Sequence, residues 1–518
     1  MEVAETPSAD RAAARIGQGT SARLPRVTHA EVSEAPPIRR GARRRRWFQP
    51  SMNAQRSLAI NAAADWFDGG GLLDDLRRRV AFRTESQHRE RAPELARYLT
   101  EEIGPAVGRL GFRWTLWENP AAGAPPMFFA ERIEDPSLPT MLTYGHGDVV
   151  AGHDDQWTGG RSPWDVSESD GRWYGRGTAD NKGQHTINLA ALGCVVAARG
   201  RLGFNAKLLL EMGEEVGSPG LRQLCEARAE SLSADVLIAS DGPRLRSDRP
   251  TIFLGSRGAF NFDLVVDLRE GAHHSGNWGG LLANPGTMLA NAIASMVDAR
   301  GRILVDALRP APIPASVRRA LAEIEPGEPD GPAIDENWGE PQLSPAERVF
   351  GWNALEVLAF RTGNPDRPVN AIPPRASAHL QVRFVVGCDS RHFIPAIRTH
   401  LDLRGFAKVE IRPGDSEPMA ATRLDPDHPW VRWAVESIAA TSGLRPAILP
   451  NLGGSLPNDC FADVLRLPTI WVPHSYPACS QHAPDEHMLA AVAREGLMIM
   501  TGLFWDLGDP GCTPVRPK

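Results

Sequence analysis

The chain of 518 residues lacks several features that would assign it to a class at once. No stretch approaches the roughly 18 consecutive apolar residues of a membrane-spanning helix, so no membrane span is predicted. The net charge of −6 gives no electrostatic basis for binding nucleic acid. No Gly-x-Ser-x-Gly elbow occurs in the sequence, which disfavours a nucleophilic serine hydrolase.

Cysteine is scarce, and no pair has Cys-x-x-Cys spacing. Scattered cysteines suit a reducing compartment in which thiols stay free, so a cytoplasmic location is expected. The six residues are Cys194, Cys225, Cys388, Cys460, Cys479 and Cys512.

The first 55 residues lack apolar periodicity and are rich in Ala, Arg, Pro and Ser, with an arginine run at 39–46. This composition predicts a disordered tail, with a tether to nucleic acid or an acidic surface as the alternative. No apolar segment follows the arginines, so neither a secretory nor a twin-arginine export signal is expected. Foldable sequence begins near Ala59, just after Met52, so a reading frame that starts too early is another alternative.

Beyond the tail, apolar runs alternate with helical periodicity. Strands are predicted at 138–144, 206–212, 234–239 and 469–473, and helices at 183–199, 429–442 and 485–505. This alternation predicts an α/β fold class, a sheet layered with helices. Near Gly255 the pattern changes to the β-α-β-α-β order of a ferredoxin-like (α+β) domain, with elements at 258–268, 284–297, 376–386, 391–403 and 407–412.

The predicted boundaries follow from these patterns. The tail covers 1–55, the first domain 56–256 and 415–510, the inserted domain 257–414, and a second short tail 511–518.

Polar residues with metal-binding side chains follow the predicted strands. His146 follows the first of them, Glu214 and Glu215 the second, and Asp241 the third. Binding residues gather where the carboxyl ends of strands open into loops. A lone residue of this kind is more often a turn residue, but flanking glycines such as Gly145 and Gly147 let the backbone approach a site closely.

The chemistry of a two-metal centre explains the residue types. Two divalent ions about 3.5–4 Å apart need a bridging carboxylate, and each takes further imidazole or carboxylate ligands. Asp180 could bridge, His146 with Asp241 could complete one ion, and Glu215 with His482 the other.

Two carboxylates remain after the ligands are assigned. Asp148, two residues after His146, is placed to receive the second imidazole N–H. Glu214 is adjacent to a ligand without being one, which suits a general base. A carboxylate-rich N/O site accepts zinc, manganese or cobalt.

The sequence closely resembles the metallopeptidase family of carnosinases, non-specific dipeptidases, aminoacylases, acetylornithine deacetylases and glutamate carboxypeptidases. The similarity runs from about Ala62 to about Leu507. The matching strings are Gly145–Val150, Gly175–Gly183, Glu214–Ser218, Ser240–Gly242, His274–Gly276, Asn370–Pro373, Gly453–Ser455 and His482. The resemblance implies the same ligands and base as the residue types do, and a cis peptide bond between Asp180 and Asn181.

The resemblance also implies roles in the inserted domain, which is the lid of this family. His274, or its neighbour His273, would stabilise the oxyanion, often across a dimer interface. Arg383 would hold the substrate carboxylate with Gly453, Gly454 and Ser455, and Asn370 would contribute to substrate binding. A homodimer formed through the lid is expected.

The predicted function is a metallohydrolase that cleaves an amide bond next to a free carboxylate, a dipeptidase of the carnosinase-like branch. Two divalent ions, zinc first with manganese or cobalt as alternatives, would carry a bridging hydroxide, with Glu214 as the base. Deacylation of N-acyl amino acids is the alternative. A non-catalytic protein on this fold would be expected to lack Glu214 or a ligand, and none is missing.

Overall fold

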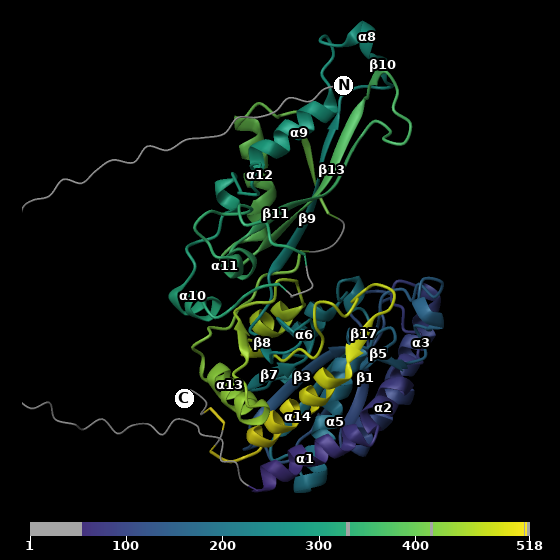
Figure 1. Ribbon diagram of the computed structural model, residues 1–518, viewed down its shortest axis with the longest axis vertical. Helices are drawn as coiled ribbons and strands as arrows, with labels where there is room; N and C mark the ends of the chain where they lie inside the picture. Colours follow the sequence, from purple (N-terminus) through teal and green to yellow (C-terminus); the bar gives the residue numbers. More distant parts are fainter. Residues whose placement is uncertain (1–53, 328–331, 415–417, 512, 515–518) are drawn as a thin grey trace, which may run out of the picture. The chain divides into compact units, whose positions relative to one another are not determined.

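The computed structural model describes residues 54–327, 332–414, 418–511 and 513–514 (Figure 1). The predicted tail at 1–55 lies outside the described residues except for its last two positions. These two residues open helix α1 (Ala54–Asp68). Most of the second predicted tail, residues 512 and 515–518, also lies outside them.

The first sheet has eight strands in the order β1-β2-β6-β3-β7-β16-β8-β15. Strands β6, β3, β7 and β16 pair in parallel. The pairs β1–β2, β2–β6 and β16–β8 are antiparallel. Strand β16 lies between β7 and β8, although it comes more than 200 residues later. The strands are β1 (Arg113–Trp117), β2 (Met127–Arg132), β3 (Thr140–His146), β6 (Asn205–Glu211), β7 (Val236–Ala239), β8 (Thr251–Phe253), β15 (Ala447–Leu449) and β16 (Thr469–Trp471).

Alternating side chains give this sheet two buried faces. On β6, Leu208 and Leu210 belong to one apolar cluster and Leu209 to the other. The first cluster is completed by α1, α2 (Gly71–Val80), α3 (Ala92–Arg97), α4 (Gly104–Arg109), α5 (Lys182–Arg199), α13 (Pro429–Ser442) and α14 (Ala490–Leu507). The second is completed by α6 (Leu221–Ala227), α7 (Ala229–Leu232), α10 (Ala315–Leu321) and α11 (Pro345–Phe350). The predicted α/β class, with helices on both faces, is confirmed.

Helices from opposite ends of the chain pack together on the first face. Figure 1 shows α1 and α14 side by side, and both contact α5. Arg56 on α1 is buried, and its Nε donates to Asp506 Oδ1 on α14 at 2.8 Å. Such a pair is costly to break because the remaining partner becomes an uncompensated buried charge.

The lid has its own antiparallel sheet, in the order β11-β13-β9-β14, and its own apolar cluster. Asn284 caps α9 by accepting the N–H groups of Gly286 and Thr287, as Asn284 and Pro285 predicted. The elements are β9 (Gly258–Asp267), α9 (Pro285–Met296), β11 (Ala354–Thr362), β13 (Arg375–Phe384), α12 (Phe393–Leu403) and β14 (Glu410–Pro413). The short strands β10 (His273–His274) and β12 (Ala371–Ile372) pair beside them, followed by α8 (Ser275–Trp278).

Three details differ from the sequence-based expectation. The lid has a further strand, β11, so its order is β-α-β-β-α-β. The predicted helix at 485–505 begins only at Ala490, because His487–Leu489 form the strand β17 instead. Strand β17 pairs with β5 (Arg172–Tyr174), and β5 pairs on its other side with β4 (Ser167–Ser169). Helices α10 and α11, inside the predicted lid range, contribute to the core of the first domain instead.

Among the described residues, no helix has both the length and the apolar content needed to cross a membrane.

Candidate metal centre and substrate cavity

The strands place the predicted ligands at one edge of the first sheet. Parallel pairing aligns His146 at the end of β3 with Glu211 at the end of β6. Glu214 and Glu215 follow β6 in a short turn, and Asp241 follows β7 by two residues. The backbone at Gly147 passes so close to Tyr98 that a Cβ there would lie 2.5 Å from the ring. Only glycine fits that approach.

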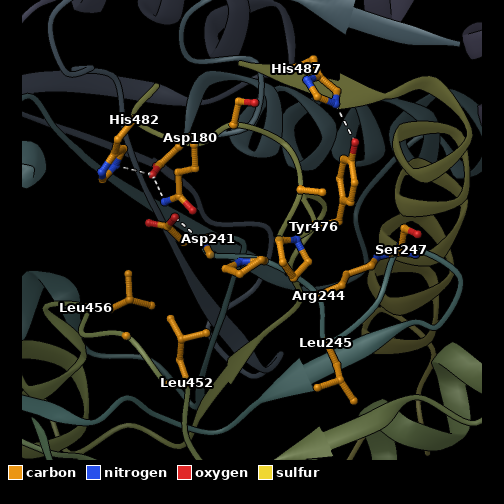
Figure 2. A pocket seen from close by; sticks show the side chains of 18 of the residues that line it. Asp180, Asp241, Arg244, Leu245, Ser247, Leu452, Leu456, Tyr476, His482 and His487 are labelled. Atoms are coloured by element: carbon orange, nitrogen blue, oxygen red, sulfur yellow. Dashed lines mark hydrogen bonds and ion pairs between the residues drawn. The ribbon is translucent and has the colours of Figure 1, made fainter. Parts of the chain in front are cut away.

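Asp180 lies between the two predicted ligand histidines. Its Oδ1 is 2.9 Å from His146 Nε2. Its Oδ2 is 3.1 Å from His482 Nε2, a contact drawn in Figure 2. The peptide bond between Asp180 and Asn181 is cis, as the resemblance implied. Each carboxylate oxygen therefore faces a different imidazole, the arrangement that a bridging ligand requires.

The remaining predicted ligands complete two groups that share Asp180. Asp241 Oδ2 lies 3.7 Å from His146 Nε2, and Glu215 Oε2 lies 3.1 Å from His482 Nε2. His146, Asp180 and Glu215 also offer ligand atoms within 4.8 Å of one another. The structure thus brings together all five residues that the sequence proposed as ligands.

The donor atoms fit divalent cations. Asp241 Oδ2 and Glu215 Oε1 are buried and have no hydrogen-bond partner in the described structure. An unpaired buried carboxylate oxygen is costly, and coordination to a cation would satisfy it. Imidazole and carboxylate together are the donors that zinc, manganese and cobalt accept. The cluster is therefore a candidate divalent-metal site.

Electrostatics within the cluster also favour a cation. Burial raises the pKa of Asp241 to about 7, and the Asp180 carboxylate adds to this effect. Hydrogen bonds to Asp180 and Glu215 raise the pKa of His482 to about 10. The negative charge of Asp180 contributes to both shifts, and a bound divalent ion would offset that charge.

Glu214 lies beside the ligands without contacting them closely. Its Oε2 is 4.0 Å from His146 Nε2, and its side chain is 14% exposed. Burial raises the pKa of its carboxyl group well above the ordinary value; His146 opposes this and Asp241 adds to it. A carboxylate that favours the protonated form is suited to accepting a proton during a reaction.

Asp148 makes contacts beyond the one predicted. The Asp148 carboxylate is 3.4 Å from His146 Nδ1. The backbone carbonyl of Asp148 is a nearer acceptor for the same nitrogen, at 3.0 Å. The two carboxylate oxygens accept the backbone N–H groups of Glu214 and Glu215, each at 3.2 Å. Asp148 therefore also fixes the turn that carries both glutamates.

A cavity of about 1440 Å³ opens beside the cluster and is lined by Asp180, Glu214, Glu215, Asp241 and His482. Arg383, Gly453, Gly454 and Ser455, the predicted carboxylate-binding residues, also line it. Arg383 Nη1 donates to Ser455 Oγ at 2.7 Å, so β13 of the lid and the 453–455 loop meet at the cavity. These residues lie together as the sequence proposed.

His274 and Asn370 lie elsewhere. They are neighbours, because His274 pairs with Ala371 across β10 and β12 and Ser275 N–H donates to the Asn370 carbonyl at 2.9 Å. Neither lines the cavity, and His274 is exposed. The adjacent His273 belongs to the same short strand. Within one chain, the structure does not bring these residues to the metal site.

Three residues of the site were missed by sequence reasoning. Gln481, next to a ligand, donates to Asp180 Oδ2. Arg257 Nε donates to the Gly453 carbonyl at 2.8 Å, and its pKa is lowered to about 10 by burial and by the nearby Arg383. The buried Glu486 accepts the backbone N–H groups of Gly177, Ala179 and Asp180.

Glu486 belongs to the site because it links the loop that carries His482 to the loop that carries Asp180. It follows His482 by four residues, and the N–H groups it accepts belong to the loop that carries Asp180. It also forms an ion pair with the buried Arg176 at 2.7 Å. The spacing of Glu486 from His482 was visible in the sequence, but its partners lie about 300 residues earlier.

Residues 142–506 match the model of peptidase family M20/M25/M40. The cysteinylglycine-S-conjugate dipeptidase of Corynebacterium striatum is 28% identical over 381 residues, which cover 72% of this chain and 80% of that protein. The mouse β-Ala-His dipeptidase is 37% identical over 184 residues, covering 35% of this chain and 37% of that protein.

Among solved structures, human carnosine dipeptidase 1 has a TM-score of 0.70 and 22% identity. The similarity covers 88% of this chain and 99% of that one. At this level of identity, the likeness is one of fold.

Proposed function

Because this chain belongs to peptidase family M20/M25/M40, a family of metal-dependent hydrolases, we propose that it is a dipeptidase that cleaves the amide bond next to a free carboxylate. The relatives are named as dipeptidases, which supports dipeptide cleavage more than deacylation of N-acyl amino acids. The observation that carries the proposal is one cavity lined by both the carboxylate–imidazole cluster and Arg383 with Ser455. Such a cavity can hold a carboxylate while its neighbouring amide lies at the metal site.

The proposed cofactor is a pair of divalent ions, zinc first with manganese or cobalt as alternatives. His146 and Asp241 would hold one ion, Glu215 and His482 the other, and Asp180 both. When bound, the ions supply Lewis acidity, which polarises the scissile carbonyl and lowers the pKa of water.

The protein's own groups then handle binding and proton transfer. Glu214 accepts a proton at Oε2 from the attacking water and delivers it to the leaving amine nitrogen. Asp148 orients the His146 ring and holds the Glu214–Glu215 turn at its backbone. Arg383 and the 453–455 loop hold the substrate carboxylate and fix the position of the amide.

We further propose that the protein acts as a homodimer through the lid, with His274 reaching the site of the partner copy. Strand β11 is an edge strand of the lid sheet, and its Val357, Leu358 and Phe360 are 42%, 55% and 45% exposed. An exposed apolar edge of this kind is a ready surface for pairing. The free thiols of the described cysteines support the cytoplasm as the proposed location.

The dipeptidase proposal is tested by a substrate panel. Purified protein, stripped by a chelator and reloaded separately with zinc, manganese or cobalt, is assayed on neutral dipeptides and the matching N-acetyl amino acids. We expect dipeptide cleavage that disappears with the metal and returns on reloading. Cleavage of the N-acetyl compounds alone would favour the deacylase, and activity that survives chelation would contradict the metal-dependent mechanism.

For Arg383→Ala, we expect kcat/KM for a free-acid dipeptide to fall about fiftyfold, since a charge-assisted hydrogen bond is lost. The C-terminally amidated form of the same dipeptide should be cleaved slowly by the wild type and almost equally slowly by the variant. The four rate constants form a double-substitution cycle that measures the coupling between Arg383 and the carboxylate. If the variant loses the same factor on both substrates, the carboxylate is held by other groups.

A further inference from the structure

One wall of the cavity is formed by the small three-stranded sheet β17-β5-β4. Arg172 pairs with Leu489 and Tyr174 with His487 across β5 and β17, so these four side chains share one face. All four line the cavity. Trp173 and Met488, on the opposite face, are buried in the apolar core. The core thereby fixes which side chains this sheet presents to the cavity.

The wall is rich in cationic and aromatic groups. The Arg161 guanidinium lies 3.8 Å from the centre of the Tyr174 ring, and Arg161 also lines the cavity. The Tyr476 hydroxyl group lies 2.6 Å from His487 Nε2, and its interaction with Arg172 raises the pKa of that guanidinium. These contacts hold the side chains in place, so the wall is pre-organised before any ligand arrives.

Negative charge on this wall is limited. Among the described residues that line the cavity, Asp485 is the only one with a carboxylate outside the metal cluster. Asp485 already accepts Thr158 N–H and Oγ–H, and it lies 3.5 Å from Arg161. Arg172 forms no ion pair with any carboxylate of the described chain; Asp170 acts on it only through space. Arg172 therefore presents an uncompensated positive charge to the cavity.

This wall lies apart from the proposed carboxylate-binding loop. Figure 2 shows Tyr476 and His487 on one side of Asp180 and Asp241, and Leu452 and Leu456, which flank the 453–455 loop, on another. A substrate whose C-terminal carboxylate meets Arg383 extends past the metal cluster with its other end. The wall is therefore placed to contact the N-terminal, acyl part of the substrate.

We propose that this wall is a subsite for a second carboxylate, and that Arg172 selects substrates that carry one on the acyl side. The inference rests on the proposed function and names its substrate class: dipeptides whose N-terminal residue is aspartate or glutamate. A dicarboxylic N-acyl group, such as succinyl, carries the same chemistry. A lysine at the N-terminal position places like charge against Arg172 and is disfavoured.

The test compares three dipeptides that share the C-terminal residue and differ only at the N-terminal side chain: glutamate, glutamine and lysine. For the wild type, we expect kcat/KM to be about fivefold higher with glutamate than with glutamine, the scale of a partly exposed ion pair. Lysine should be the poorest of the three. Arg172→Glu should reverse the order of glutamate and lysine.

Arg113→Glu is the matched control. It makes the same charge change on the exposed edge strand β1, outside the cavity lining, and should leave the order unchanged. If Arg172→Glu leaves the glutamate-to-lysine ratio at the wild-type value, the subsite proposal is overturned although the dipeptidase proposal stands. Cleavage of N-succinyl amino acids but not of any dipeptide would keep the subsite and reject the dipeptidase proposal.

Discussion

Glu214→Gln should keep its metal and lose catalysis, with kcat reduced about a thousandfold or more. The amide has nearly the shape of the carboxylate but cannot accept a proton from water. Metal binding should persist because Glu214 stands 4.0 Å from His146 and is not needed in either ligand group. Metal content is measured by elemental analysis, and turnover on the best dipeptide of the panel.

Glu215→Gln is the matched comparison, because it replaces the carboxylate of the neighbouring residue by the same amide group. Glu215 Oε2 lies 3.1 Å from His482 Nε2, so this variant should lose metal as well as activity. If Glu214→Gln loses metal while Glu215→Gln keeps it, the roles of the two residues are exchanged.

Asp180→Ala should remove metal more thoroughly than any other single ligand substitution. Two cations a few ångströms apart repel each other, and the bridging carboxylate is the group that offsets this repulsion. We expect almost no retained metal and turnover reduced to background. His146→Ala removes a neutral ligand from one group only, and should retain part of its metal.

The two variants are dialysed against the same chelator series and analysed for metal per chain. Asp180→Asn provides a control that keeps the shape of the side chain and removes its charge. Equal retention in the alanine variants would count against Asp180 as the bridge. Circular dichroism on each variant separates loss of metal from loss of fold.

The grouping of the five proposed metal ligands could be predicted from the sequence because the chemistry dictates both residue type and location. His146 is the last residue of the apolar strand β3, and Asp241 follows β7 by two residues; parallel strands bring their carboxyl ends to one edge. Glu486 could not be found in this way, since its importance lies in backbone groups about 300 residues away. Arg257 was missed for the same reason, because only the fold brings it to Gly453.

Strand β11 was not predicted from the sequence, and the reason is local. Its register on β13 shifts between Val357 and Ala359, so one residue bulges out and the apolar alternation is interrupted. Strand β17 is only three residues long and precedes a strongly apolar helix. Its extended form depends on pairing with β5, which no local pattern reveals.

The position of β16 between β7 and β8 bears on how the chain assembles as it leaves the ribosome. Strands β7 and β8 are made early, yet they cannot join in one sheet until Thr469–Trp471 has emerged and entered between them. The lid sheet, by contrast, comes entirely from residues 258–413 and can close its core while synthesis continues. We expect the inserted domain to fold first, and the domain that begins the chain to be completed last.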